Sequence, residues 1–364
     1  MSDIFPKKYS EITSEYLNKV LEPKFNTEII SFKKGEEIEP GFTGEVIRII
    51  PQFKELKESL PKSLIFKFQT ANQGIREFMA KIKGYEKEIK IYEILNSIKE
   101  LNTPKIFHSE LSQDGKYYII IMEDLNEKGL FRINKEKPFD IKILKLIVKY
   151  FAELHSNFWG KEKQNKIEWI NDYNFGEYIK EFTIQNFDKK KLYFINNNKN
   201  KLNETLINKI KGIKISELYE TINPEKNKNR ITLLHGDTQH GNLMINKEKD
   251  KMAMIDWQYI NIGLGLKDII LFIGISLDEN NIKEEDIKEL KNIYINCLKE
   301  KGINYDIELF EEDWKNICLI SLCNIISASA EENIKNDEEK RKKYGDYLLL
   351  SENRFITFLQ KQNL

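Results

Sequence analysis

The sequence is poor in cysteine and histidine, and both shortages restrict the chemistry that it can carry. Its three cysteines, Cys297, Cys318 and Cys323, show no metal-ligand spacing. Cys318 and Cys323 share an apolar stretch with helical periodicity, which favours buried thiols over a disulfide and fits a reducing compartment. A metal site built mainly from imidazole would have only four histidines to draw on: His108, His155, His235 and His240.

Net charge and long hydrophobic runs are also missing. Lys and Arg number 58 and Asp and Glu number 58, so no net field favours nucleic acid or an anionic membrane. The most apolar run of the C-terminal half, residues 269–277, is too short to span a bilayer. Residues 1–8 lack the apolar core of a signal peptide. We therefore expect a cytoplasmic protein without nucleic-acid or membrane partners.

No internal repeat or low-complexity linker divides the chain. Its 364 residues are enough for two lobes, because single cores rarely grow past about 250–300 residues. No proline follows Pro224, and the last hundred or so residues show the periodicity of successive amphipathic helices.

The most informative stretch runs from Leu233 to Gln258. An apolar pair leads into His235-Gly236-Asp237, and Asn242 follows the aspartate five residues later. Two short apolar strands around a polar turn then lead to Asp256. This hairpin brings two carboxylates and an amide to its two ends. Phosphoryl transfer from ATP needs this set, because one carboxylate accepts the hydroxyl proton while an Asn and an Asp hold magnesium.

A purely local role for these residues is the alternative. Asp and Asn are common in turns, so Asp237 and Asp250 could belong to turns and Asn242 could cap a strand. A lone Asp-x4-Asn would therefore carry little information. The full run, with His-Gly before it and Ile-Asp-Trp after a strand of suitable length, is far more specific and favours catalysis.

These residues carry a resemblance to a known family. His235–Asn242, followed by Asp256-Trp257-Gln258, resembles the catalytic segment of the aminoglycoside phosphotransferase and choline kinase superfamily, most of all its ecdysteroid-kinase-like branch and bacterial relatives. Weaker markers extend the resemblance from about residue 12 to 275. It implies an α+β, two-lobed protein-kinase-like fold. Residues 1–124 would form a small antiparallel-sheet lobe and residues 125–364 a large helical lobe.

The segments of the expected small lobe follow the kinase order. Residues 41–50 read as strand–turn–strand, and Gly41 and Gly44 lie at the bend, where a kinase loop covers the phosphates, although two such glycines also mark ordinary β-turns. Residues 63–69 read as a strand in which Lys67 alternates away from an apolar face. The resemblance implies that Lys67 contacts the ATP phosphates.

A helix with apolar residues at helical spacing is expected from residue 76 to residue 95. Glu86, Glu88 and Glu93 on this helix are the possible partners of Lys67. The Glu-x3-Tyr pattern of the resembling family selects Glu88. Residues 116–125 then form a buried strand after a turn at Gly115, and the resemblance implies that the main chains of Glu123 and Leu125 bind adenine.

The expected large lobe begins with an amphipathic helix over residues 140–159. His155 lies on its apolar face, where a histidine usually bonds to backbone inside the core, so we assign it to structure. Asp268, at a helix start, would brace the catalytic loop by the resemblance, and could equally cap its own helix.

The site residues then have the following expected roles. Asp237 is the candidate catalytic base, and Asn242 and Asp256 are the candidate ligands of Mg²⁺. Lys67, aligned by Glu88, would neutralise the phosphates of ATP. The role of His240 is open, and so are ATP versus GTP preference and the oligomeric state.

Two alternatives belong to other classes of protein. A metal-dependent hydrolase could use His235, Asp237, His240 and Asp256, since His-x-Asp-x2-His can ligate zinc or iron. The small number of other histidines and the kinase-like order upstream weaken it. A nucleotide-binding pseudokinase is disfavoured because every residue type that transfer requires is present.

The expected acceptor is the hydroxyl of a small molecule, contacted by residues 160–228. This segment is slightly basic, whereas a polycationic aminoglycoside would call for clustered carboxylates. A steroid-like or other hydrophobic alcohol is therefore the first expectation, with aminoglycosides, choline and other amino alcohols as alternatives. Six aromatic residues could line the pocket or merely pack helices: Trp169, Tyr173, Phe175, Tyr178, Phe182 and Phe187.

Overall fold

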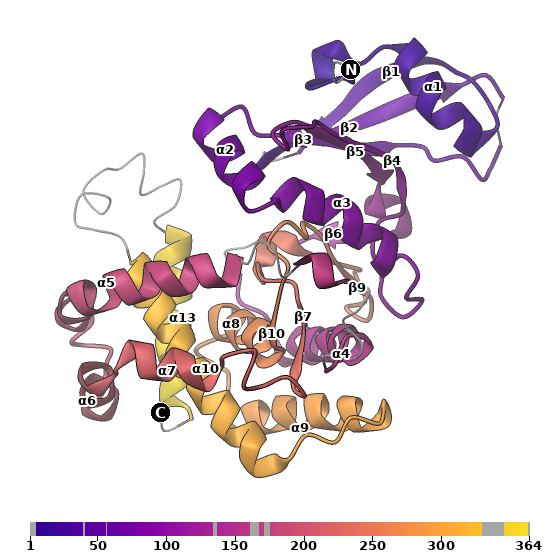
Figure 1. The fold of residues 1–364 in the computed structure, drawn as a ribbon. Coiled ribbons are helices and arrows are strands. Elements are labelled where there is room, and N and C mark those ends of the chain that lie inside the picture. The colour runs from indigo at the N-terminus through magenta and orange to yellow at the C-terminus, as the bar shows by residue number, and fades with distance from the viewer. Residues whose placement is uncertain are drawn as a thin grey trace. The chain divides into compact units, whose positions relative to one another are not determined.

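The computed structural model describes residues 5–38, 41–55, 57–133, 137–160, 167–170, 175–329 and 346–362. The chain forms two compact units (Figure 1). Unit 1 comprises Met1–Phe131 together with Met244–Tyr259. Unit 2 comprises Arg132–Leu243 and Ile260–Leu364. The hairpin that ends in Asp256 therefore belongs to the same unit as the N-terminal sheet.

Unit 1 is built on a five-stranded antiparallel sheet in the order β1-β2-β3-β5-β4. The strands are β1 (Ile29–Glu37), β2 (Gly44–Phe53), β3 (Leu64–Gln69), β4 (Ile106–Leu111) and β5 (Tyr118–Glu123). Helix α1 (Ser14–Phe25) begins after Thr13, whose side chain accepts from the Tyr16 N–H. A short 3₁₀ helix, Tyr9–Glu11, precedes it.

The two faces of β3 have different environments, as its alternation predicted. Leu64, Phe66 and Phe68 are fully buried in a core that includes Leu17 and Leu21 of α1. Lys67 alternates to the other face, where α2 (Gln73–Lys81) and α3 (Gly84–Leu95) lie (Figure 1). The pleat of one strand thus separates the apolar core from the face that carries a buried charge.

One expectation about this face was wrong. The sequence predicted a single helix over residues 76–95, whereas the structure has α2 and α3 with a break at Lys83. Lys83 has a φ of 52°, in the left-handed region, and a right-handed helix cannot continue through such a residue. The apolar periodicity runs through both helices and therefore does not reveal the break.

The rest of unit 1 is a small sheet in the order β6-β8-β9. Its strands are β6 (Phe131–Arg132), β8 (Leu243–Ile245) and β9 (Met252–Met254), and a 3₁₀ helix, Leu125–Lys128, precedes β6. Leu125, Leu130, Met244 and Ala253 form a buried cluster. The Asn102 side chain also donates to the Met252 carbonyl at 3.1 Å, which ties the hairpin to the N-terminal part of the unit.

Unit 2 is mainly helical. Strands β7 (Ile231–Leu234) and β10 (Asn261–Leu264) pair antiparallel, and a 3₁₀ helix covers His240–Asn242. The described helices are α4 (Ile141–Asn157), α5 (Phe175–Asn197), α6 (Glu204–Gly212), α7 (Ile215–Thr221), α8 (Leu266–Ser276), α9 (Glu284–Glu300), α10 (Ile307–Ala328) and α13 (Asp346–Gln360). Helix α4 packs beside α9, α5 beside α10, and α8 beside both α10 and α13. The predicted α+β class, with an antiparallel sheet first and helices after it, is confirmed.

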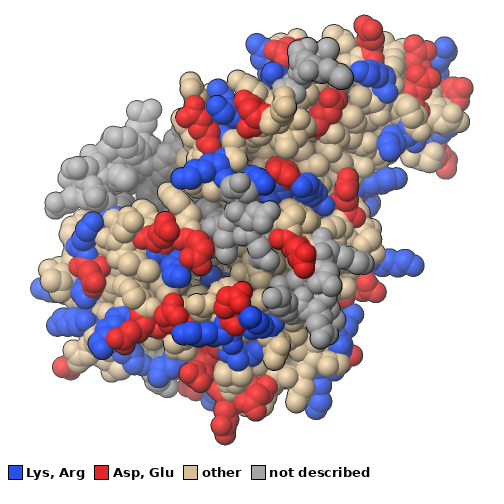
Figure 2. Space-filling model, viewed as in Figure 1, with Lys and Arg blue, Asp and Glu red and all other residues tan. Residues whose placement is uncertain are grey.

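Several predictions from composition can be compared with the structure. Acidic and basic side chains are mixed over the face shown in Figure 2. Among the described residues, no helix is both long and apolar enough to cross a membrane. All three cysteines are free, and Cys318 and Cys323 are buried, as predicted. Burial raises the pKa of both buried thiols.

Candidate active site

The predicted catalytic loop begins where β7 ends, in unit 2. Leu233 and Leu234 are buried, and His235-Gly236-Asp237 follow at once. The carboxylate of Asp268, from the first turn of α8, accepts hydrogen bonds from the N–H groups of His235 at 2.7 Å and Gly236 at 3.1 Å. Asp268 is only 2% exposed, so these bonds are shielded from water. The carboxylate thereby fixes the backbone immediately before Asp237.

A second layer holds the Asp268 side chain. His155 of α4 is fully buried, with Nε2 at 3.4 Å from Asp268 Oδ2 and Nδ1 at 2.9 Å from the Tyr294 hydroxyl. The Thr232 hydroxyl donates to the His155 carbonyl at 2.7 Å. His155 thus lies in the core beside the loop, as predicted, and connects α4 with α9 and β7.

Amide groups hold the carboxylate of Asp237. The Asn242 Nδ2 donates to Asp237 Oδ2 at 2.8 Å and to its carbonyl at 2.9 Å. Gln239 Nε2 donates to both carboxylate oxygens, at 3.1 and 2.9 Å. Since the Asn242 nitrogen faces Asp237, its side-chain oxygen is the atom that a cation would contact. The structure therefore brings two predicted site residues, Asp237 and Asn242, into direct contact.

His240, whose role was open, is buried among aromatic residues. Its ring centroid lies 4.3 Å from that of Phe139 and 6.2 Å from that of Phe272. Burial, together with the positive charge of Arg354, lowers the pKa of His240 to about 4. The imidazole is therefore neutral near pH 7 and packs in the interior of unit 2.

The second group of predicted residues lies in unit 1 around Lys67. Its Nζ is 2.7 Å from Glu88 Oε1 and 2.8 Å from Asp256 Oδ1. Burial opposes the charge of Lys67, but the carboxylates of Asp256 and Glu88 outweigh it and raise the lysine pKa. The ammonium is therefore charged at neutral pH and bridges two carboxylates that the sequence separates widely.

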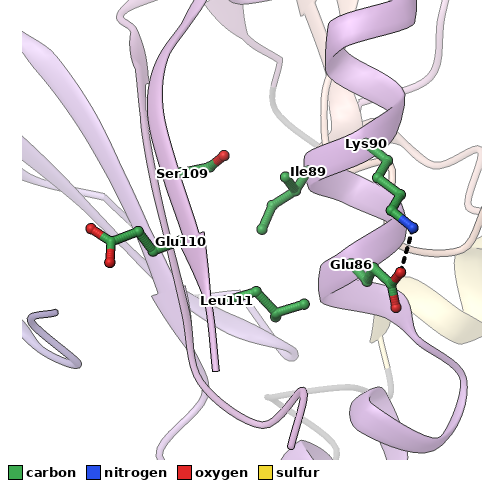
Figure 3. A pocket seen from close by; sticks show the side chains of 6 residues that line it. All are labelled: Glu86, Ile89, Lys90, Ser109, Glu110 and Leu111. Carbon is green, nitrogen blue, oxygen red and sulfur yellow. Dashed lines mark hydrogen bonds and ion pairs between the residues drawn. The ribbon is translucent and has the colours of Figure 1, made fainter. Parts of the chain in front are cut away.

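The other two glutamates of α3 have different positions. Glu86 pairs with Lys90, and both are among the residues that line a hollow of about 220 Å³ at α3 and β4 (Figure 3). This hollow is also lined by Ile89, Ser109, Glu110 and Leu111, and none of the predicted site residues takes part in it. Glu93 is exposed. Glu88 is thus the partner of Lys67 that the Glu-x3-Tyr pattern selected.

Two further residues hold Glu88, and sequence reasoning did not assign them to the site. Gln258 Nε2 donates to Glu88 Oε2 at 2.9 Å and to the Tyr118 hydroxyl at 2.9 Å. Tyr118 stacks on Tyr85 with ring centroids 4.1 Å apart. The signal for Gln258 was its place two residues after Asp256; nothing local marks Tyr118, which lies in an apolar strand.

Asp256 itself has an unusual backbone conformation. Its φ is 67°, in the left-handed region that non-glycine residues rarely adopt. The adjacent Trp257 is fully buried, and its Nε1 donates to the Met254 carbonyl at 3.1 Å. The surrounding packing therefore holds Asp256 in a conformation that costs of order 1–3 kcal/mol and is typical of functional sites.

The predicted glycine loop packs closely on the strand of Lys67. A β-carbon on Gly44 would lie 2.5 Å from the Phe68 carbonyl oxygen and 3.7 Å from Lys67 Cε, so the close approach of β2 requires glycine here. The Thr43 carbonyl accepts from the Tyr85 hydroxyl at 2.8 Å. Gly41 is exposed.

Main-chain bonds restrict how Glu123 and Leu125 could contact a base. The Glu123 N–H donates to the Lys105 carbonyl at 2.9 Å, and the Leu125 carbonyl accepts from Leu130 N–H at 3.1 Å. These two main-chain groups are therefore already bonded within the protein. Asp124 between them accepts from the Ser63 hydroxyl at 2.8 Å and pairs with Arg48.

The metal-hydrolase alternative gains no support from side-chain geometry. Within the part of the chain that the structure describes, no three His, Cys, Asp or Glu side chains are grouped so that they could hold a metal ion. His240 packs against Phe139, and the Asp237 carboxylate accepts hydrogen bonds from the amides of Asn242 and Gln239. The His-x-Asp-x2-His spacing thus does not produce a converging ligand set.

Comparison with known proteins gives the family. The model of the ecdysteroid kinase-like family matches residues 39–304, which is more than half of the chain. No curated protein matches the sequence significantly. A choline kinase from Cryptosporidium parvum is similar in structure, with a TM-score of 0.53, 15% identity and coverage of 98% of this chain and 96% of that one. An ethanolamine kinase from Plasmodium vivax has a TM-score of 0.50, 16% identity and coverage of 97% and 90% respectively.

These structural likenesses show a kinase-like fold, and the family match covers the Lys67 cluster, the catalytic loop and Asp268 alike. The chain belongs to the ecdysteroid kinase-like family and is a small-molecule kinase.

Proposed function

We propose that this protein transfers the γ-phosphoryl group of ATP, with Mg²⁺, to a hydroxyl group of a small molecule. The observation that carries the proposal is the charged cluster in which Lys67 contacts both Glu88 and Asp256. A lysine held between these carboxylates fits a phosphate-binding role, because its ammonium is fixed in position and remains charged.

The chain offers suitable donors for the metal. Mg²⁺ prefers carboxylate and amide oxygens and is usually bound by few protein ligands. Asp256 supplies a partly exposed carboxylate and Asn242 an amide oxygen, and the β8–β9 hairpin connects the two residues. Bound there, the metal would neutralise charge on the phosphates of ATP.

The other predicted residues complete the nucleotide site. Lys67 would contact the phosphates, and Glu88 would hold it in place. The backbone around Gly41 and Gly44 would cover the phosphates. The Glu123 carbonyl and the Leu125 N–H would bond to adenine. We also propose that residues 1–124 and 125–364 act as separate lobes. The proposed location of the protein is the cytoplasm.

Asp237 is the proposed base. Its carboxylate accepts the proton of the acceptor hydroxyl while the hydroxyl oxygen bonds to the γ-phosphorus and the bond to the ADP oxygen breaks. Asn242 and Gln239 hold the carboxylate by hydrogen bonds, so it is oriented before the acceptor arrives. Transfer of this kind depends on positioning and charge neutralisation more than on covalent catalysis.

A steroid-like or other hydrophobic alcohol is the proposed acceptor. The name of the matching family and the aromatic residues of segment 160–228 support it. Of those aromatics, Phe187 is fully buried and packs the helices, whereas Tyr178 is 46% exposed. Tyr173 and the Phe175 side chain lie outside the described residues. Choline-like amino alcohols and aminoglycosides are the alternatives to test.

The test is ADP release with Mg-ATP against pooled steroids, aminoglycosides, amino alcohols and sugars. We expect acceptor-dependent ADP release that falls roughly 10²–10⁴-fold in Asp237→Ala. Asp250→Ala is the matched control, because Asp250 is an exposed turn residue of the same hairpin region, and it should retain activity.

Three other results would contradict the proposal. ADP release that survives in Asp237→Ala would remove that residue from catalysis. Nucleotide binding without transfer to any acceptor would indicate a pseudokinase. Turnover without nucleotide, by protein purified with zinc or iron, would indicate a hydrolase.

A further inference from the structure

Lys267 of unit 2 is a lysine in an unusual position. It lies in the first turn of α8, directly before Asp268. Its Cδ is 3.6 Å from the point where a β-carbon of Gly263 would stand, and a Leu234 methyl carbon lies 3.0 Å from the same point. The lysine stem therefore runs over β10 in space that a glycine leaves open, beside the last residue before the catalytic loop.

Lys267 also lacks a partner. Within the described ranges of the chain, no hydrogen bond or ion pair to its ammonium group is present, although the side chain is partly buried. The neighbouring carboxylate, Asp268, bonds to the N–H groups of His235 and Gly236. Glu177 of α5 pairs instead with Lys180, at 3.3 Å.

The charges around Lys267 do not compensate for its burial. Burial lowers the pKa of Lys267, and the nearby Lys180 acts in the same direction, whereas Asp268 and Glu177 only partly offset them. A cation in the first turn of a helix is also disfavoured by the helix dipole. Lys67 shows the contrast, since it is only 6% exposed but contacts two carboxylates, whereas Lys267 is partly buried. A partly buried ammonium without a carboxylate partner among the described residues favours an anion from outside.

We propose that Lys267 binds an anionic group of the acceptor, which would be an alcohol that also carries a carboxylate, sulfate or phosphate. This inference rests on the proposed kinase function and narrows its substrate class. Lys267 is adjacent in sequence to Asp268, which fixes the loop of Asp237, and the charges of Glu177 and Lys180 on α5 act on it. Helix α5 belongs to the segment in which the acceptor contacts are expected.

A cation at Lys267 changes the class of acceptor that we expect from a neutral alcohol to a hydroxy acid. An unpaired cation would repel choline-like and aminoglycoside ammonium groups and attract an acid. Together with the aromatic residues of the same segment, it indicates an amphipathic hydroxy acid, with an apolar body and one anionic end. A charge-assisted hydrogen bond contributes roughly 1.5–3 kcal/mol, which corresponds to about a tenfold to hundredfold preference for the acid.

The first experiment compares a hydroxylated steroid carboxylic acid with its carboxamide, which has the same shape but no charge. We expect the wild-type protein to bind the acid about 10–100-fold more tightly, by calorimetry, and to phosphorylate it with a correspondingly lower KM. Lys267→Met should abolish this preference without affecting ATP binding, and Lys267→Arg should restore much of it. Lys145→Met, which removes a lysine of α4 that pairs with Glu289 at 2.6 Å, is the matched control and should keep the preference.

The second experiment does not depend on turnover. In ¹⁵N-lysine NMR spectra, with the Nζ signal assigned from Lys267→Met, Lys267 should titrate below the ordinary lysine pKa of about 10.4. The steroid acid and inorganic sulfate, at matched ionic strength with chloride, should raise that pKa, and the carboxamide should not.

The outcomes separate this inference from the kinase proposal. An ordinary lysine pKa, a signal that no anion shifts, or an acid preference that survives in Lys267→Met would overturn the role of Lys267. A shift produced by ATP but not by the acid would assign the lysine to the nucleotide. A response to the acid without phosphorylation of any acceptor would support the anion site and refute the kinase proposal.

Discussion

The two groups of predicted site residues are held in different ways. In unit 1, Lys67 of β3 is fixed by two carboxylates, Glu88 of α3 and Asp256 after β9, and Gln258 supports the arrangement. In unit 2, Asp237 follows a backbone that Asp268 clamps from a buried core containing His155 and Tyr294. In the proposed function Lys67 would contact phosphate and Asp256 would contact Mg²⁺, so the ion pair between them would be exchanged for contacts with the ligand. The arrangement around Asp237 in unit 2 instead keeps the backbone of the loop in one conformation.

Asp268→Asn should show the largest effect, because it weakens the rigid arrangement. An amide has one acceptor oxygen for the two backbone donors at His235 and Gly236, so the loop shifts and kcat falls about 100-fold. Stability should drop by ~2 kcal/mol through an unsatisfied buried donor, measured by urea unfolding. The KM for ATP should remain unchanged. Asp188→Asn, on the surface of α5, is the control, and an equal loss in both variants would refute the clamp.

Lys67→Met tests the exchangeable arrangement. It leaves Glu88 and Asp256 without their shared cation, so we expect a loss of ~3 kcal/mol in the free energy of unfolding. The KM for ATP should rise at least about tenfold, since one charge-assisted contact to phosphate is lost. Steady-state kinetics and urea unfolding provide both numbers. An unchanged KM would mean that this lysine does not reach the nucleotide.

The pH dependence of stability tests the interior of unit 2. The pKa of His240 is about 4 in the folded protein, below the ordinary value of 6.5, so the unfolded chain binds the extra proton more readily. The corresponding stability, up to ~3 kcal/mol, is present above pH 6.5 and is lost as pH falls toward 4. His240→Phe should lack this part of the slope in urea titrations, whereas His108→Gln should keep it. Identical slopes for His240→Phe and wild type would contradict the buried, neutral imidazole.

Gln258→Leu should produce the smallest of these effects. It removes the amide that bonds to Glu88 and Tyr118, which should cost ~1–2 kcal/mol and raise the KM for ATP a few-fold. Glu86→Gln, on the same helix as Glu88, is the matched control, because its ion pair with Lys90 is exposed. If thermal denaturation and KM do not distinguish the two variants, Gln258 does not position Glu88.

Predictions from the sequence succeeded where the pattern was local and failed where a residue depends on a partner far away in the sequence. Period-2 alternation around Lys67 and the string from His235 to Asn242 are local patterns, and the structure places both as the patterns indicate. The break at Lys83 escaped because apolar spacing continues across it. Gln258 and Tyr118 escaped because each acts through a partner at least 30 residues away in the sequence.

The sequence by itself determined the family and the fold class, since these depend on residue types at short spacing. It also supplied the residues that we propose for phosphoryl transfer. Only the tertiary structure decided that Asp256 shares Lys67 with Glu88, that His240 is buried and neutral, and that Lys267 has no ion pair with any residue that the structure describes. The Lys67–Asp256 contact joins residues 189 positions apart, and burial depends on what the rest of the chain packs around a side chain. Such pairings and their electrostatic consequences are properties of the folded chain and have no local signature.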